Sequence, residues 1–126
     1  MFIRWRIFME LCEHGTACES AVKKAQEGMP SEADISLMCE MLKILGEPSR
    51  MKIVMALMQG ELCVLHIVQA VGGNQSAVSQ QLKVLKNGKL IKSRREGKNI
   101  LYSIADGHVL EIVKMSAEHA VCERTV

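Results

Sequence analysis

Apolar residues recur at helical spacing in four successive stretches between residues 38 and 85. The four stripes are Met38, Met41, Leu42 and Leu45; Ile53, Val54, Leu57 and Met58; Val64, Ile67, Val68 and Val71; and Val78, Leu82 and Leu85. Residues three and four apart share one face of a helix, so the pattern predicts four amphipathic helices. Glycines that suit helix ends follow the stripes: Gly46, Gly60, Gly72-Gly73 and Gly88. Pro48 suits the first turn of the second helix, and Asn74 suits the N-cap of the fourth.

The hydrophobic period changes after residue 88. Ile100, Tyr102 and Ile104 recur at every second position, and Leu90–Arg95 precedes them across Glu96-Gly97, a pattern that predicts a β-hairpin. Asp106 then suits the N-cap of a last helix. One face of that helix carries Val109, Ile112, Val113 and Ser116. The predicted fold is therefore mainly α with a small β-hairpin, in the order of four helices, the hairpin and a last helix.

The chain before these elements has a different character. Residues 10–32 are polar and interrupted by Gly15, Gly28 and Pro30, which predicts an N-terminal arm over residues 1–32 that is partly flexible and has room for one helix. We expect the main domain over residues 33–122 and a short tail over 123–126. Cys39 lies beside the first apolar stripe and is expected to pack in the core.

The composition narrows the class of protein. The chain has 126 residues, of which 48% are hydrophobic and 24% charged, as in one globular domain. No apolar run approaches the roughly 20 residues that span a bilayer, and arginines interrupt the short apolar start, so we expect a cytoplasmic protein. Five cysteines, an odd number, argue against a disulfide framework. Only four aromatic residues are available, too few for a base-stacking platform that binds single strands.

Positive charge is concentrated in one segment. Residues 76–104 carry seven basic residues and one acidic residue, a net charge of +6, whereas the whole chain carries +2. The basic residues are Lys83, Lys86, Lys89, Lys92, Arg94, Arg95 and Lys98. A basic segment on an otherwise acidic chain indicates a polyanion partner, although a solvated charged face would have the same composition.

The fourth predicted helix carries residues suited to reading DNA. With Val78, Leu82 and Leu85 turned inward, four polar residues fall on the opposite side, namely Ser76, Ser79, Gln80 and Lys83. A tight Gly-Gly-Asn turn separates this helix from the preceding one, as in a helix-turn-helix. The hairpin carries Arg94, Arg95 and Lys98 near its tip, where a wing would reach DNA. These features favour DNA binding over an ordinary helical bundle.

The segment Leu42–Ile104 resembles the ArsR/SmtB family of metal-responsive winged-helix repressors. The resemblance lies in LGEPSR, GELCV, QSAVSQQLKVL and SRREGKNILY, and the segment that contains them covers about half of the chain. It implies a homodimeric winged helix-turn-helix protein that binds a near-palindromic operator in double-stranded DNA and releases it when an inducer binds. It also implies that Ser76, Ser79 and Gln80 lie in the major groove.

The last predicted helix carries a first candidate metal site made of Asp106, His108, His119 and Cys122. His108 and His119 are about 16 Å apart along a helix, too far for one zinc ion, whose ligands lie at about 2.0–2.3 Å. Two antiparallel copies of the helix in a dimer would bring both ends together, giving two sites. The spacing resembles the family's C-terminal zinc site, except that Cys122 replaces a histidine or glutamate. A thiolate makes cadmium or lead credible beside zinc. The alternative is an N-cap aspartate with surface histidines.

Cys63 and His66, spaced by one helical turn, form a second candidate site. The arm supplies three further donors, namely Cys12, His14 and Cys18. The resemblance supports a cysteine in GELCV and thiols from the arm, but Leu65 stands where arsenic-responsive members carry a second cysteine. The alternative is that Cys63 fills the core.

The sequence therefore predicts a metal-responsive repressor, with a divalent metal ion as inducer, zinc first and cadmium or lead next. One alternative is a redox-responsive repressor in which Cys12 or Cys18 pairs with Cys63. Another is a metal-buffering protein without operator specificity. A zinc hydrolase is disfavoured because no general base stands at a fixed offset from a three-ligand site, so we expect no enzymatic activity.

Overall fold

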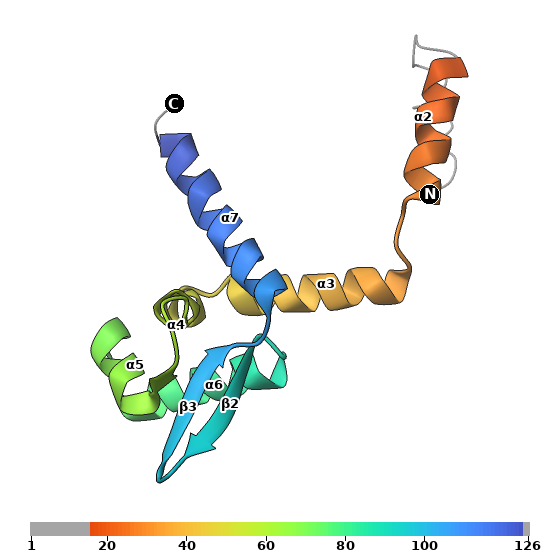
Figure 1. Ribbon diagram of the computed structural model, residues 1–126. Coiled ribbons are helices and arrows are strands. Elements are labelled where there is room, and N and C mark those ends of the chain that lie inside the picture. The colour runs from red at the N-terminus through yellow and green to blue at the C-terminus, as the bar shows by residue number, and fades with distance from the viewer. Residues whose placement is uncertain (1–15, 125–126) are drawn as a thin grey trace. The chain divides into compact units, whose positions relative to one another are not determined.

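The computed structural model describes residues 16–124 (Figure 1). In chain order the elements are α2 (Thr16–Glu27), α3 (Glu32–Leu45), α4 (Pro48–Leu57), β1 (Leu62–Cys63), α5 (Val64–Val71), α6 (Gln75–Asn87), β2 (Ile91–Glu96), β3 (Asn99–Ile104) and α7 (Gly107–Arg124). The chain divides between Ile35 and Ser36 into two units. The first unit holds α2 and the start of α3, and the second holds all later elements. The predicted order of four helices, hairpin and helix is confirmed for α3 to α7.

Side chains cap the starts of α6 and α7 as the sequence predicts. Asn74 Oδ1 accepts a hydrogen bond from the Ala77 amide at 2.8 Å, at the start of α6. Asp106 Oδ1 accepts one from the Val109 amide at 3.0 Å, at the start of α7. Each bond satisfies an amide that has no partner within its helix, so these caps define where α6 and α7 begin.

Backbone conformation defines where the helix-turn-helix changes direction. Gly72 has φ 83° and ψ −179°, and Gly73 has φ 88°, so both lie in a region that side chains with a Cβ rarely adopt. The predicted end of α5 at this glycine pair is confirmed. Two glycines in succession allow the chain to leave α5 and enter α6 within three residues.

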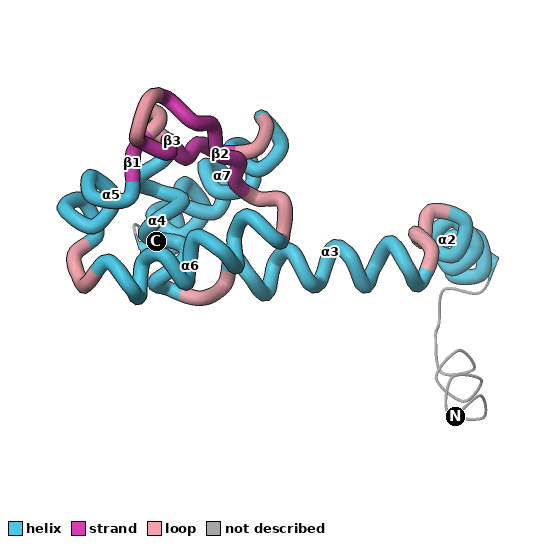
Figure 2. Tube along the Cα trace, turned by 90° about the horizontal axis from the view of Figure 1, so that it is seen from below, coloured by secondary structure: helices cyan, strands magenta, loops and turns pink. Residues whose placement is uncertain are grey.

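The sheet has one strand more than the sequence predicts. β2 and β3 form the expected antiparallel hairpin, with the turn at Gly97-Lys98, because Glu96 still pairs with Asn99. The short strand β1 adds to the other edge of β3, where Leu62 pairs with Tyr102, so the strand order is β1-β3-β2 (Figure 2). β1 joins the hairpin to the segment that leads directly into α5.

The core collects the apolar stripes of α4, α5 and α6 together with the hairpin and α7. Its buried members are Leu45, Ile53, Val54, Leu57, Ile67, Val78, Leu82, Leu85, Leu90, Ile91, Val109 and Val113. Because α7 buries Val109 and Val113 in the same core as the inner face of α6, the two helices share one packed interior.

The apolar stripe of α3 joins the core only towards the end of the helix. Leu45 is buried and Met41 packs against the core, whereas Met38 and Leu42 are each 51% exposed. Cys39, expected in the core, is exposed as well. Helical spacing identifies an apolar face but not what covers it, and within one chain this face lies open. Among the helices in the described part of the chain, none has both the length and the apolar character needed to cross a bilayer.

Candidate nucleic-acid interface and metal ligands

The outer face of α6 gathers the four residues selected from its helical spacing. Ser76, Ser79, Gln80 and Lys83 line one shallow, open depression together with Gln75 and Ala77. The cap at Asn74 and the buried inner side chains hold this face outward. Hydroxyl, amide and ammonium groups on one exposed helical face can donate and accept hydrogen bonds at base edges.

The β2–β3 hairpin, the wing, carries three predicted DNA-binding residues, and one of them, Arg94, is bound within the chain. Arg94 is engaged within the chain: its Nε donates to Glu61 Oε2 at 2.7 Å and its Nη2 donates to Glu61 Oε1 at 3.0 Å. Arg94 Nη2 also reaches Glu96 Oε2 at 3.2 Å. The Arg94 side chain holds the pKa of Glu61 below its ordinary value, and this partnership raises the pKa of Arg94. Arg94 therefore holds the wing against the segment before β1.

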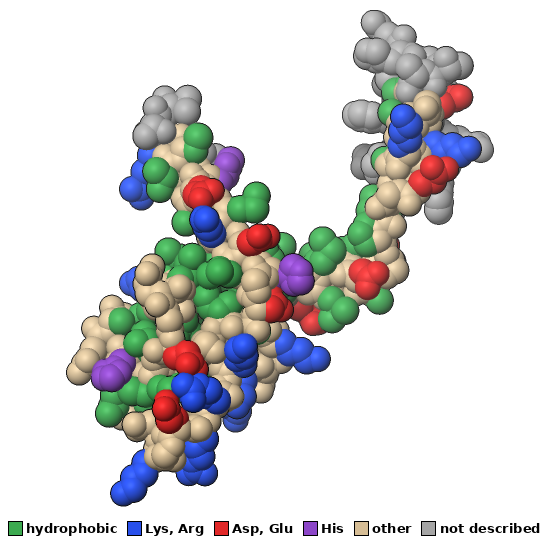
Figure 3. Space-filling model, viewed as in Figure 1, with side chains coloured by type: hydrophobic (Ala, Val, Ile, Leu, Met, Phe, Trp, Pro, Cys, Tyr) green, Lys and Arg blue, Asp and Glu red, His purple; other side chains and the backbone are tan. Residues whose placement is uncertain are grey.

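Arg95 and Lys98 are exposed near the tip of the hairpin. Lys and Arg side chains gather over this end of the molecule, at the bottom of Figure 3, which is viewed as in Figure 1. The wing is also tied to α6, because Lys86 Nζ donates to Ser93 Oγ at 2.6 Å. The hairpin and the exposed face of α6 thus form a single basic surface, and the hydrogen bond between Lys86 and Ser93 holds the two elements together.

The ion pair between Arg94 and Glu61 was not predicted from the sequence. Glu61 is 33 positions away, and no local spacing connects the two residues. The only signal would have been an isolated acidic residue before a strand, which does not identify a partner on its own.

The first candidate metal site is divided between the two ends of α7. His108 Nδ1 lies 3.6 Å from Asp106 Oδ1, and the His108 side chain is 93% exposed. His119 and Cys122 lie in the last turns of α7, so roughly 16 Å of helix separates the two histidines. Within residues 16–124 as described, no three His, Cys, Asp or Glu side chains stand close enough to hold a metal ion.

The chemistry of this donor set nevertheless fits zinc. A carboxylate, two imidazoles and a thiolate are all ordinary zinc ligands, and four of them complete a tetrahedral shell. Asp106 caps α7 through Oδ1, and its second oxygen remains chemically suited to ligation. One chain presents half of the set at each end of the helix.

The second candidate site is only partly described. Cys63 ends β1 and is the N-cap residue of α5, while His66 lies exposed one turn further on. Cys18 lies on α2, in the first unit. Cys12 and His14 lie outside the described residues.

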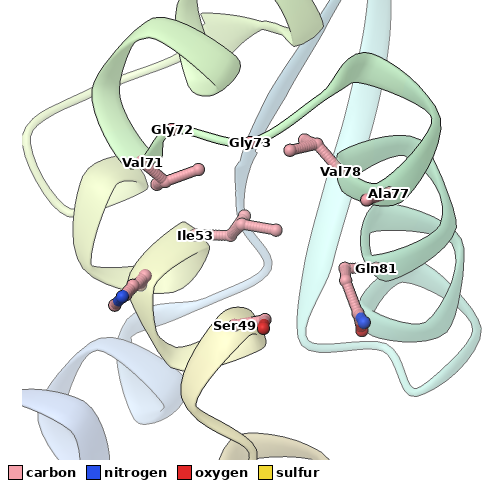
Figure 4. Close-up of a pocket in the computed structure, with 9 residues that line it drawn as sticks. Ser49, Ile53, Val71, Gly72, Gly73, Ala77, Val78 and Gln81 are labelled. Carbon is pink, nitrogen blue, oxygen red and sulfur yellow. The ribbon is translucent and has the colours of Figure 1, made fainter.

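A further groove lies on the flank of the helix-turn-helix (Figure 4). Its lining comes from α4, from the Gly72-Gly73 turn and from α6, with Ser49 of α4 facing Gln81 of α6 across it. The groove reaches the core residues Ile53 and Val78 and exposes the flank of α6 that carries Gln81.

Comparisons with known proteins agree with this geometry. The family described as bacterial regulatory protein, arsR family, matches residues 47–93, from the start of α4 into β2. A transcriptional repressor SmtB homolog from Synechocystis is 36% identical over 111 residues, which cover 88% of this chain and 84% of that protein. A cadmium resistance transcriptional regulatory protein CadC homolog from Staphylococcus aureus is 30% identical, over 87% of this chain and 91% of that protein.

A solved structure extends the similarity to three dimensions. The homodimeric winged helix-turn-helix DNA-binding domain of a possible ArsR-family regulator from Mycobacterium bovis matches with a TM-score of 0.67 and 31% identity. The match covers 74% of this chain and 89% of that one.

The fold and its basic face define a winged helix-turn-helix transcription regulator. The chain belongs to the ArsR/SmtB family. It is accordingly a transcriptional repressor of that family, and the family consists of DNA-binding regulators rather than enzymes.

Proposed function

We propose that the protein is a metal-responsive repressor that binds operator DNA as a homodimer and releases it on binding zinc, or a softer divalent ion such as cadmium or lead. One observation carries the proposal: Asp106, the cap of α7, and His108 lie at the start of the helix, whereas His119 and Cys122 lie near its end. Two antiparallel copies of α7 would combine these halves into two four-ligand sites related by symmetry.

The exposed apolar faces support pairing of two chains. Met38 and Leu42 of α3 are half exposed, and Met115 and Val121 of α7 are 66% and 60% exposed. A large apolar face on a soluble domain is stabilised when a partner covers it. The Mycobacterium bovis domain, described as homodimeric, supports a second copy as that partner.

The name of one relative supports metal as the inducer. The Staphylococcus aureus protein is named as a homolog of a cadmium resistance transcriptional regulatory protein. Cys122 adds a soft donor to an otherwise borderline set, which favours cadmium and lead beside zinc. A bound ion would supply a link between the two copies of α7.

Packing between α7 and α6 would carry the effect of metal binding to the residues that contact DNA. Because α7 shares the buried core with α6, a change in how two α7 helices pair alters the spacing of the two copies of α6. Ser76, Ser79 and Gln80 would read base edges, and Lys83, Arg95 and Lys98 would contact phosphates. Two half-sites about one helical turn apart require a fixed spacing, so a small change weakens binding.

Fluorescence anisotropy on DNA from the protein's own upstream region tests the proposal. Binding is measured without metal and then with zinc, cadmium or lead, for wild type, His119→Ala and the matched control His66→Ala. We expect metal to release wild type and His66→Ala but not His119→Ala. The coupling free energy is expected to be about 1–3 kcal/mol, or roughly 5–150-fold in affinity.

Two other outcomes would favour a different sensor. Metal release of His119→Ala, with loss of release in His66→Ala, would move the sensor to Cys63, His66 and the arm residues Cys12, His14 and Cys18. If no metal alters DNA binding, the metal proposal fails. A peroxide response abolished by replacing Cys12 and Cys18 with serine would then support the redox-responsive repressor.

A further inference from the structure

One arginine joins three helices of the DNA-binding unit. Arg50, in the first turn of α4, donates its Nε to the carbonyl oxygen of Ile44 at 2.7 Å, in the last turn of α3. Its Nη1 donates to Gln81 Oε1 on α6 at 3.1 Å. The guanidinium is planar and carries its donors in a rigid fork, so one side chain fixes the separation of two acceptors on different helices.

The base of this arginine is itself anchored. Glu47 Oε2 accepts a hydrogen bond from the Arg50 amide at 3.0 Å and caps α4. Backbone hydrogen bonds from Ser49 and Arg50 lower the pKa of Glu47, so the cap stays ionised at neutral pH. The Arg50 backbone is thus held at the start of α4, and the half-buried side chain spans the distance to α6.

Ile44 touches the region of α6 at a second point. Gly88 follows the last residue of α6, and a Cβ atom built there would lie 2.6 Å from Ile44 Cδ1. The end of the Ile44 side chain therefore packs directly against Gly88, and any larger residue there would require that side chain to shift. The last turn of α3 is therefore linked to α6 at two points, to Gln81 near the middle of α6 through the Arg50 side chain and directly to Gly88 at its end. Two separated contact points define the direction of a helix, whereas one contact point does not.

Gln81 lies on the flank of α6 rather than on its basic face. It is half-buried and lines the groove with Ser49 and Ala77, whereas its neighbour Gln80 lies on the exposed face (Figure 4). A rotation or tilt of α6 at Gln81 would displace Gln80 and Ser79 directly. Displacement of about 1 Å is enough to lose a bidentate contact to a base edge.

We propose that Arg50, acting through Gln81, is a positioning residue that sets the direction of α6 relative to α3 and thereby supports discrimination of operator from other DNA. This inference rests on the proposed role of α6 in reading the operator. It assigns sequence discrimination to a residue pair outside the basic face.

The test compares four variants with wild type. Arg50→Met and Gln81→Met each remove one side of the bridge, and Gln81→Met also keeps the side-chain length. Gln81→Glu keeps an oxygen acceptor for the guanidinium and serves as the conservative rescue. Lys52→Met, on an exposed turn of α4, is the matched control because it removes one positive charge of the same unit, as Arg50→Met does.

The measured quantity is the ratio of Kd for unrelated DNA to Kd for operator DNA, at one salt concentration and without metal. We expect Arg50→Met and Gln81→Met to lower this ratio roughly tenfold, the effect of weakening one contact to a base edge. Gln81→Glu and Lys52→Met should keep a ratio near that of wild type. The slope of log Kd against log salt for unrelated DNA should be unchanged in Gln81→Met, because the phosphate contacts remain.

A thermal melt and an NMR signal separate positioning from folding. The Arg50 Nε–H resonance should be retained in Gln81→Met, which shows that the bond to Ile44 and the fold persist. Equal weakening of operator and unrelated DNA binding would overturn the inference, and so would an unchanged ratio in both methionine variants. Wild type without any preference for operator DNA would overturn the proposed function, whereas a wild-type preference that both methionine variants retain would overturn only this inference.

Discussion

Asp106 has two tasks that substitution can separate. It caps α7 through a 3.0 Å bond from the Val109 amide to Oδ1, and it is a proposed metal ligand. Asparagine caps a helix as well as aspartate does, whereas alanine cannot cap it. Asp106→Ala should therefore lose both tasks, and Asp106→Asn should lose only the charged ligand.

The expected magnitudes follow from this geometry. Loss of the cap costs about 1 kcal/mol of unfolding free energy. For a folded unit of this size that corresponds to a melting temperature lower by about 4 °C. In the absence of metal, Asp106→Ala should show this decrease and Asp106→Asn should melt close to wild type. Both variants should bind zinc at least about tenfold more weakly, because a carboxylate ligand is lost.

Circular dichroism melts at one fixed protein concentration, combined with zinc titrations against a competing chelator, measure both quantities. The concentration is fixed because association of two chains makes the melting temperature depend on it. An equal loss of stability in Asp106→Asn and Asp106→Ala would refute the capping argument. Wild-type zinc affinity in Asp106→Asn would refute the assignment of Asp106 as a ligand.

Three further predictions concern the turn and the wing. Gly72→Ala should lower the unfolding free energy, measured in urea, by about 1–3 kcal/mol, because Gly72 has φ 83° and ψ −179°. The control Gly107→Ala should have no effect, because Gly107 has no positive φ and a Cβ atom there would meet open space. Equal effects of the two substitutions would contradict the strain argument. The pKa of Glu61 is lowered on folding, so the ionised carboxylate contributes to stability at neutral pH, and this contribution is lost as the pH falls below roughly 4. The stability difference between wild type and Glu61→Gln should therefore vanish at that low pH. A difference that stays constant with pH would contradict this role of Glu61. Arg95→Met should reduce the salt slope of DNA binding by about 1, while Arg94→Met should change it little, because Arg94 is held by Glu61. Equal slopes for the two variants would show that Arg94 also contacts phosphate.

Much of the DNA-binding unit could be predicted because its signals act within one helical turn. The cap at Asn74 reaches three residues ahead, and the cap at Asp106 does the same. The Gly72-Gly73 pair ends α5 through its own backbone angles. The spacing of Val78, Leu82 and Leu85 assigns the inner face of α6, and this leaves Ser79 and Gln80 on the outer face. Such signals need no knowledge of the rest of the chain.

Other features depend on where distant segments meet. The strand β1 is two residues long, too short for any period, and exists because Leu62 lies beside Tyr102. Arg94 holds the wing rather than standing free for DNA because folding brings Glu61 to it from 33 positions away. The bridge from Arg50 to Gln81 likewise spans 31 positions.

The α3 helix shows the same limit from the other side. Its stripe is as regular as that of α6, yet Met38 and Leu42 are exposed while Leu82 and Leu85 are buried. The helices, the hairpin, their ends and their polar faces could be predicted because they follow from residues close together along the chain. Which apolar face is covered and which charge is paired could not, because burial and ion pairing depend on the atoms that packing brings from elsewhere in the chain.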